Sequence, residues 1–147
     1  MQYRVMFLTA ILGLALVACD SGPKSASGFR LPDGDIERGK TAFLEMKCNA
    51  CHTVAGVDLP APEVAPPVTV VLGGETNKVH TYGQLVTAII NPSHELAKGY
   101  PLELIQSGGQ SRMTNYNEVM TVHQMIDLVA FLQSRYKVVL PEPVGGL

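Results

Sequence analysis

Five consecutive residues, Cys48-Asn49-Ala50-Cys51-His52, constrain this chain of 147 residues more than any other feature. Cys-x-x-Cys-His is typical of sites where a haem is attached covalently. Two residues between the cysteines let the chain turn once, so that both sulfurs reach one edge of the macrocycle and form thioether bonds with its vinyl groups. The histidine that follows then lies under the iron as proximal ligand. The spacing predicts one covalent haem c, attached to Cys48 and Cys51, with His52 on the iron.

Two other interpretations of the cysteine pair stay open. A thioredoxin-like dithiol is expected in a βαβ setting, whereas this motif follows a helical pattern. A structural zinc site needs four nitrogen or sulfur ligands. The chain offers Cys19 as its one further thiol, and its remaining histidines, His80, His94 and His123, lack paired spacing.

The first residues have the pattern of an export signal. Residues 5–18 are almost wholly apolar, but the run is too short for a membrane-spanning helix, which needs about 20 residues, and it fits a signal peptide. It ends in Leu16-Val17-Ala18-Cys19, which resembles the lipobox of bacterial lipoproteins, where the cysteine is lipidated and becomes the first mature residue. We expect residues 1–18 to be a lipoprotein signal peptide and Cys19 to carry the lipid anchor. The alternative is an ordinary signal peptide with a chance cysteine.

Export agrees with haem attachment, because c-type haem is joined to its protein outside the cytoplasmic membrane. Residues 19–32 are rich in Ser, Gly and Pro and predict a flexible tether. The expected location is the bacterial cell envelope, facing the periplasm. Asp20, directly after the lipidated cysteine, resembles an inner-membrane retention signal of enteric bacteria.

A domain is expected over residues 33–140, followed by a short tail, 141–147. Its first helix is predicted to begin near Ile36, with Asp33 or Asp35 as the cap. Gly39 inside this helix costs about 1 kcal/mol relative to alanine, a cost that a close helix crossing would justify. Apolar residues at spacings of three and four are expected to face the core: Ile36, Phe43 and Leu44.

Two further helices are predicted. Thr81 can cap one that runs to about Ile90, and Asn91-Pro92 would stop it. Thr121-Val122-His123-Gln124 has the pattern of a capping box for the last helix, which ends before Pro141. The apolar stripe of this last helix comprises Met125, Leu128, Val129, Leu132 and Tyr136.

The pattern Arg38-Gly39-Lys40-x-x-Phe43 running into Cys48 resembles the N-terminal helix of class I cytochromes c. The last helix is similar to their terminal helix, and the resemblance covers residues 36–136. The segment from Tyr82 through Asn91-Pro92 to Gly99-Tyr100 is similar to the cytochrome c domains of some oxidase subunits. The resemblance implies a small all-α fold: three main helices and long loops around one haem, with the glycine and aromatic of the first helix packed on the last.

The resemblance also implies a partner for the proximal histidine. Ala65-Pro66-Pro67-Val68 is similar to the family's Gly-Pro-x-Leu segment, with alanine in place of glycine. In that segment the proline carbonyl accepts a hydrogen bond from the second nitrogen of the histidine, which fixes its tautomer. Pro66 would then orient His52. The alternative is a plain extended loop that covers the haem.

Six methionines could supply the other axial ligand of the iron. Met1 and Met6 leave with the signal peptide, and Met46 lies next to the haem motif on the proximal side. Met125 belongs to the apolar stripe of the last helix, where packing is its usual role. Met120 directly precedes the predicted helix cap, where it can form a hydrophobic staple with Met125.

Met113 is left in a polar loop that gives it no apolar partner. Met113-Thr114-Asn115-Tyr116 also resembles the family's Met-Pro-x-aromatic ligand segment, with threonine in place of proline. We therefore predict Met113 as the second axial ligand, with Met120 and His94 as alternatives.

These features favour an electron carrier over an enzyme. An iron with both axial positions filled by protein exchanges single electrons and does not readily bind a substrate. No paired carboxylates, nucleophile–base pair or phosphate-binding loop indicates separate chemistry. The formal net charge of −2 gives no indication of nucleic-acid binding. Periplasmic or membrane redox proteins are the expected partners. Other classes stay open: a haem-based sensor or peroxidase-like protein with a labile sixth ligand, and a zinc-containing scaffold lipoprotein.

Overall fold

The computed structural model describes residues 28–139. The predicted signal peptide, Cys19, most of the tether and the tail 141–147 lie outside the described residues. The chain divides into two compact units, Met1–Arg30 and Leu31–Leu147, and all elements named below belong to the second. In the described part of the chain, no helix is both long enough and apolar enough to cross a membrane.

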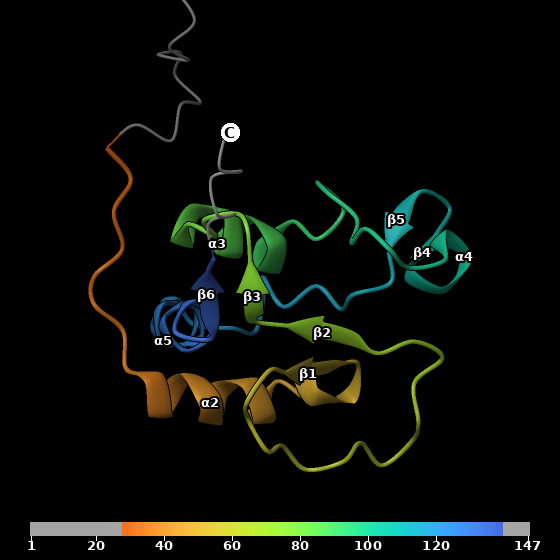
Figure 1. The fold of residues 1–147 in the computed structure, drawn as a ribbon, viewed down its shortest axis with the longest axis horizontal. Helices are drawn as coiled ribbons and strands as arrows, with labels where there is room; N and C mark the ends of the chain where they lie inside the picture. Colours follow the sequence, from red (N-terminus) through yellow and green to blue (C-terminus); the bar gives the residue numbers. More distant parts are fainter. Residues whose placement is uncertain (1–27, 140–147) are drawn as a thin grey trace, which may run out of the picture. The chain divides into compact units, whose positions relative to one another are not determined.

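Three helices of nine or more residues form the frame of the domain (Figure 1). They are α2 (Ile36–Glu45), α3 (Tyr82–Ile90) and α5 (Val122–Gln133). A single turn, α4 (Leu102–Ile105), and a 3₁₀ turn, η1 (Cys48–Ala50), complete the helical elements of residues 28–139.

The caps of the three long helices are those that the sequence predicts. The Asp35 carboxylate accepts a hydrogen bond from the N–H of Arg38 at the start of α2. Thr81 and Thr121 both form capping boxes, in which the threonine hydroxyl accepts from the backbone N–H three residues later. Each cap satisfies helical N–H groups that lack a partner within the helix.

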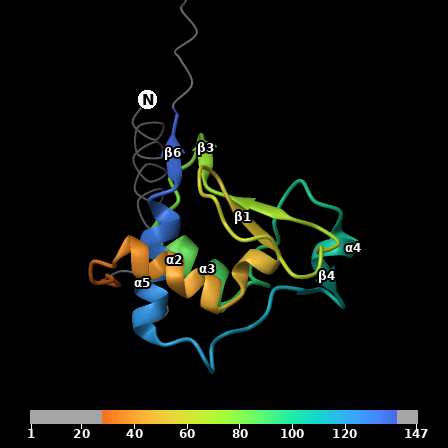
Figure 2. The ribbon, with the colours of Figure 1, turned by 90° about the horizontal axis from the view of Figure 1, so that it is seen from below.

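Helices α2 and α5 cross in close contact at a glycine. A Cβ at Gly39 would overlap the backbone oxygen of Asp127 and lie 2.6 Å from the Cβ of Phe131. Figures 1 and 2 show α2 lying across α5 from two directions. The predicted close crossing at Gly39 is thus confirmed, and it offsets the low helix propensity of glycine.

The core lies where α3 packs against this crossing. Phe43 and Phe131 are almost completely buried and meet edge to face, with ring centroids 5.8 Å apart. Ile36 was expected in the core, but its side chain is 39% exposed, so that prediction is wrong. The other buried members of the core cluster are Val54, Leu85, Val86, Ile89, Leu128, Val129 and Leu132.

One carboxylate is buried at the helix crossing. The side chain of Asp127 is 5% exposed and accepts hydrogen bonds from Arg38 Nε at 2.8 Å and Arg38 Nη2 at 3.2 Å. The backbone N–H of Asp35 donates to the same carboxylate at 2.7 Å. All three bonds link α5 to the first turn of α2, so a polar contact reinforces the apolar one.

Short strands make the all-α prediction incomplete. Two parallel pairs and one antiparallel pair are present among the described residues. The parallel pairs are β1 (His52–Val54) with β2 (Val70–Leu72), and β3 (Gly74–Thr76) with β6 (Tyr136–Val138); the antiparallel pair is β4 (Gln106–Ser107) with β5 (Gln110–Ser111).

Three of these strands change the predicted helix and loop boundaries. Helix α5 ends at Gln133, so Tyr136, expected on its apolar stripe, instead opens β6. Gly108 and Gly109, both with positive φ, form the turn of the β4–β5 hairpin. The hairpin lies away from α2 and α5 in both views (Figures 1 and 2).

Candidate functional site

The two cysteines of the motif lie in one tight turn directly after α2. Lys47 starts this turn in the left-handed region, with φ of 54°, and is the one non-glycine residue with positive φ among residues 28–139. The N–H of Cys51 donates to the Cys48 carbonyl at 3.2 Å. Cys48 is half-buried against the core, Cys51 is exposed, and both thiols are free. The turn that the Cys-x-x-Cys spacing predicts is therefore formed.

The surroundings of the thiols disfavour the two alternatives to haem. Burial raises the pKa of the Cys48 thiol to about 11, an effect that a backbone hydrogen bond partly opposes. A protonated thiol is a poor nucleophile, unlike the low-pKa cysteine of a redox dithiol. In the described part of the chain, no group of three or more His, Cys, Asp or Glu side chains could hold a metal ion. The zinc alternative therefore lacks ligands there.

His52 is oriented by strand pairing. It is the first residue of β1 and lies opposite Val70 in the parallel register with β2. Its Nδ1 is 3.3 Å from the Val70 carbonyl oxygen. Burial lowers the pKa of His52, while the contact with Val70 acts in the opposite direction. A neutral imidazole that donates its Nδ1–H to this carbonyl keeps the Nε2 lone pair free for an iron ion.

This contact corrects the prediction made for Pro66. The acceptor for His52 belongs to Val70, four residues later in the chain, and no hydrogen bond of the described residues joins His52 to Pro66. Pro66 lies in the loop before β2, whereas the β1–β2 register sets Val70 opposite His52. Leu72, two residues after Val70, packs against the core.

Met113 directly follows the β4–β5 hairpin. Its backbone N–H donates to the Ser111 hydroxyl at 3.1 Å, and its side chain is half-buried. Arg112 ties the base of the hairpin together, because its N–H donates to the Ile105 carbonyl at 2.9 Å and its Nε to the Gln106 carbonyl at 3.0 Å. The residue predicted as ligand thus follows a hydrogen-bonded hairpin, where the sequence suggested a polar loop.

Tyr116 brings the segment that carries Met113, residues 112–121 (the Met113 segment), to the cysteine turn. Its hydroxyl donates to the Met46 carbonyl at 2.5 Å, across a separation of 70 residues. Burial raises the pKa of Tyr116, and a hydrogen bond with the Thr114 side chain acts in the opposite direction. The neighbouring Cys48 and Cys51 add to the rise in this pKa when they are ionised. The predicted ligand segment is therefore held close to both cysteines.

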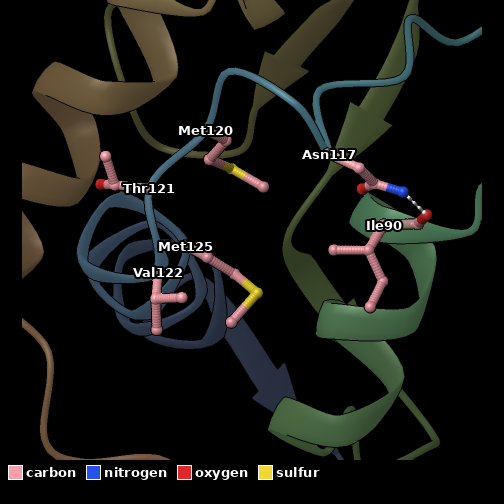
Figure 3. A pocket seen from close by; sticks show the side chains of 6 residues that line it. All are labelled: Ile90, Asn117, Met120, Thr121, Val122 and Met125. Atoms are coloured by element: carbon pink, nitrogen blue, oxygen red, sulfur yellow. Dashed lines mark hydrogen bonds between the residues drawn. The ribbon is translucent and has the colours of Figure 1, made fainter.

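The other residues that could bind the iron in place of Met113 lie in different surroundings. Met120 and Met125 line one pocket between the end of α3 and the start of α5, and their side chains lie in the same hollow in Figure 3. This is the apolar pairing expected of a hydrophobic staple. The ring of His80 stacks on Tyr136, with centroids 4.3 Å apart, and His94 is exposed. Met113 as axial ligand stays a prediction.

These residues fit a covalently attached haem. The chain supplies two thiols in one turn for thioether bonds, a neutral imidazole next to them for the iron, and a thioether on a segment tied to the same turn. A family model described as Cytochrome c matches residues 36–135. The chain belongs to the cytochrome c family.

The family match extends from the first residue of α2 to just beyond α5. It includes the whole Cys-x-x-Cys-His motif, so the haem of this cytochrome c domain is a covalently bound haem c, and the function that follows is haem-based electron transfer. Domains of this family are usually extracytoplasmic. No curated protein and no solved structure matches the chain.

Sequence reasoning missed one site residue, Val70, and one contact, that between Tyr116 and Met46. Val70 acts through its main-chain oxygen, so no side-chain motif marks it. The run Val68 to Leu72 is rich in β-branched residues, which favours a strand and could have indicated β2. The hydroxyl contact of Tyr116 spans 70 residues and has no local signal.

Proposed function

We propose that this cytochrome c domain is a membrane-anchored carrier of single electrons, with His52 and Met113 as the axial ligands of its iron. The contact between Tyr116 and Met46 is the observation that carries the proposal, because it places the Met113 segment beside the cysteine turn. With both axial positions filled by the chain, the iron has no open position for a substrate.

The residues of the chain would divide the work as follows. Cys48 and Cys51 fix the position of the cofactor through thioether bonds. Val70 would hold the Nδ1–H of His52, which would leave Nε2 to bind the iron in one orientation. The thioether of Met113 raises the reduction potential relative to a second histidine, which suits delivery of electrons to an oxidase or reductase. When bound, the haem supplies the reversible one-electron change of its iron.

Anchoring at Cys19 is supported by the lipobox-like sequence alone. Two or more acyl chains give stable attachment to a bilayer. The domain would then face the periplasm, with the inner membrane favoured, and exchange electrons with periplasmic or membrane redox proteins. Mass spectrometry of the native protein should find a lipidated Cys19 at the amino terminus, and an unmodified terminus at or beyond Cys19 would contradict the anchor.

The ligation is tested with methionine variants of the haem-loaded protein. The oxidised parent should show the weak long-wavelength band of methionine bound to ferric iron. Met113→Ala should abolish this band and lower the reduction potential, because the soft thioether that favours ferrous iron is lost. Met120→Ala is the matched control and should keep the band, since Met120 lines the pocket beside α5.

Three results would contradict the proposal. These are a band that survives in Met113→Ala, a band that disappears in Met120→Ala, and a bis-histidine spectrum of the parent. Tight binding of carbon monoxide by the native ferrous protein at neutral pH would favour the alternative of a sensor or peroxidase-like protein with a labile sixth ligand.

A further inference from the structure

The segment that carries Met113 has neither regular secondary structure nor a proline to stiffen it. All of residues 112–121 are described, and none of them belongs to a helix or strand. Thr114 stands where the similar ligand segments have proline, so the φ restriction of proline is missing. The position of Met113 must therefore depend on side-chain contacts made by its neighbours.

Two adjacent residues after Met113 bind the ends of two different helices. The Tyr116 hydroxyl donates to the carbonyl of Met46, the C-cap residue of α2. Asn117 Nδ2 donates at 2.8 Å to the carbonyl of Ile90, the last residue of α3 (Figure 3). Carbonyls at helix C-termini lack partners within the helix, so both bonds satisfy groups that are otherwise left to water.

The Tyr116 contact is the more sheltered of the two. Tyr116 is half-buried and its bond is partly buried, whereas Asn117 and its bond are exposed. Its acceptor is also firmly placed, because the N–H of Met46 binds the Ala42 and Leu44 carbonyls at the end of α2. Met46 is two residues before Cys48, so the bond links the ligand segment to the chain that holds the haem.

We propose that Tyr116 is a positioning residue, which keeps Met113 on the iron by donating its hydroxyl hydrogen bond to the Met46 carbonyl. This inference rests on the proposed ligation by Met113. The segment can swing away from the iron only when this bond breaks, so the bond sets how often the sixth position opens. Loss of one hydrogen bond of ordinary net strength shifts such an equilibrium by about tenfold.

The test uses the haem-loaded full chain and imidazole as the external ligand. Tyr116→Phe removes the hydroxyl and keeps the ring. Tyr136→Phe is the matched control, because Tyr136 lies on β6 and stacks on His80, outside the ligand segment. Titration of the ferric proteins should show about tenfold tighter imidazole binding in Tyr116→Phe. The control should equal the parent.

The reduction potential supplies a second readout. A weakened iron–thioether bond stabilises ferrous iron less, so the potential of Tyr116→Phe should fall below that of the parent, while Tyr136→Phe keeps it. The proposal is overturned if Tyr116→Phe binds imidazole as the parent does, or if Tyr136→Phe shows the same gain. A parent without a methionine–iron band, or a Met113→Ala protein that keeps the band, contradicts the ligation itself and not the role of Tyr116.

Discussion

The helix crossing and the Met113 segment are held in opposite ways. At the crossing, α2 and α5 touch at Gly39, and the rings of Phe43 and Phe131 are buried against each other. The Met113 segment has little apolar burial, and Val119 within it is 68% exposed. It is fixed by single hydrogen bonds to carbonyls at helix ends, chiefly those of Tyr116 and Asn117.

Because of this difference, the stability of the fold and the stability of the bond between Met113 and the iron should depend on different residues. Segments with few buried apolar contacts open at a lower free energy than the core does. Damage to the crossing should therefore unfold the whole domain. Damage to the ligand segment should open the sixth position of the iron and leave the helices in place.

The largest effect is expected from Gly39→Ala. The new methyl group would overlap the Asp127 backbone, so α2 and α5 must separate, at a cost of about 3 kcal/mol or more in the free energy of unfolding. Gly83→Ala in α3 is the matched control, because a Cβ there meets its nearest atom at 3.8 Å. The control should be neutral or gain up to about 1 kcal/mol in denaturant titrations. Equal stabilities of the two variants would contradict the close crossing.

A smaller loss in the free energy of unfolding, about 2 kcal/mol, is expected from Asp127→Ala. This variant leaves Arg38 and the Asp35 N–H without their acceptor. Glu75→Gln breaks the exposed pair with Lys137 and should change stability by less than about 0.5 kcal/mol.

The Asp127 contribution also depends on pH. The hydrogen bond from Arg38, and then that from the Asp35 N–H, lower the pKa of Asp127 below its ordinary value. A carboxyl with a lowered folded-state pKa stabilises the native state above its unfolded pKa, about 4, and this stabilisation is lost as the pH falls through the folded pKa. The stability difference between parent and Asp127→Ala, followed by denaturant titration, should therefore shrink below about pH 4. A difference that is constant down to pH 2 would contradict this origin.

The two capping boxes allow the helical frame and the Met113 segment to be compared with one kind of substitution, threonine to alanine. Thr81→Ala and Thr121→Ala should each lower the free energy of unfolding by about 1 kcal/mol, since each removes a cap from a long helix. Thr121 also ends the Met113 segment, so Thr121→Ala alone should tighten imidazole binding to the ferric protein. Tighter imidazole binding in both variants would show that opening of the sixth position follows the stability of the whole fold. It would contradict independent stabilities of the helical frame and the Met113 segment.

The helical frame could be predicted because its signals are local. Asp35, Thr81 and Thr121 are recognised as caps from their own neighbours, and Gly39 stands out in a helical pattern. Ile36 was misplaced because the spacing of apolar residues alone could not tell which members of the stripe the neighbouring elements cover. Phe131 lies off the predicted stripe, yet it is fully buried between α5 and α2.

Much less of the site could be predicted, since its contacts join distant parts of the chain. The cysteine turn is local and follows from its spacing. The Val70 oxygen reaches His52 through a parallel pairing of three-residue strands, which no pattern within either strand specifies. The buried Asp127 is unexpected for the same reason, because its partners lie about 90 residues away along the chain.

The acceptor for His52 is a main-chain oxygen, which bears on how the sequence can drift over evolutionary time. Every amino acid carries this oxygen, so replacement of the Val70 side chain leaves the acceptor in place. An inserted or deleted residue between 60 and 69 could be absorbed by the loop, whereas one inside β2 would shift its register against β1 and turn its side chains to the opposite face. The segment is therefore permissive to point substitution and intolerant of single-residue insertions or deletions within three positions, 70–72.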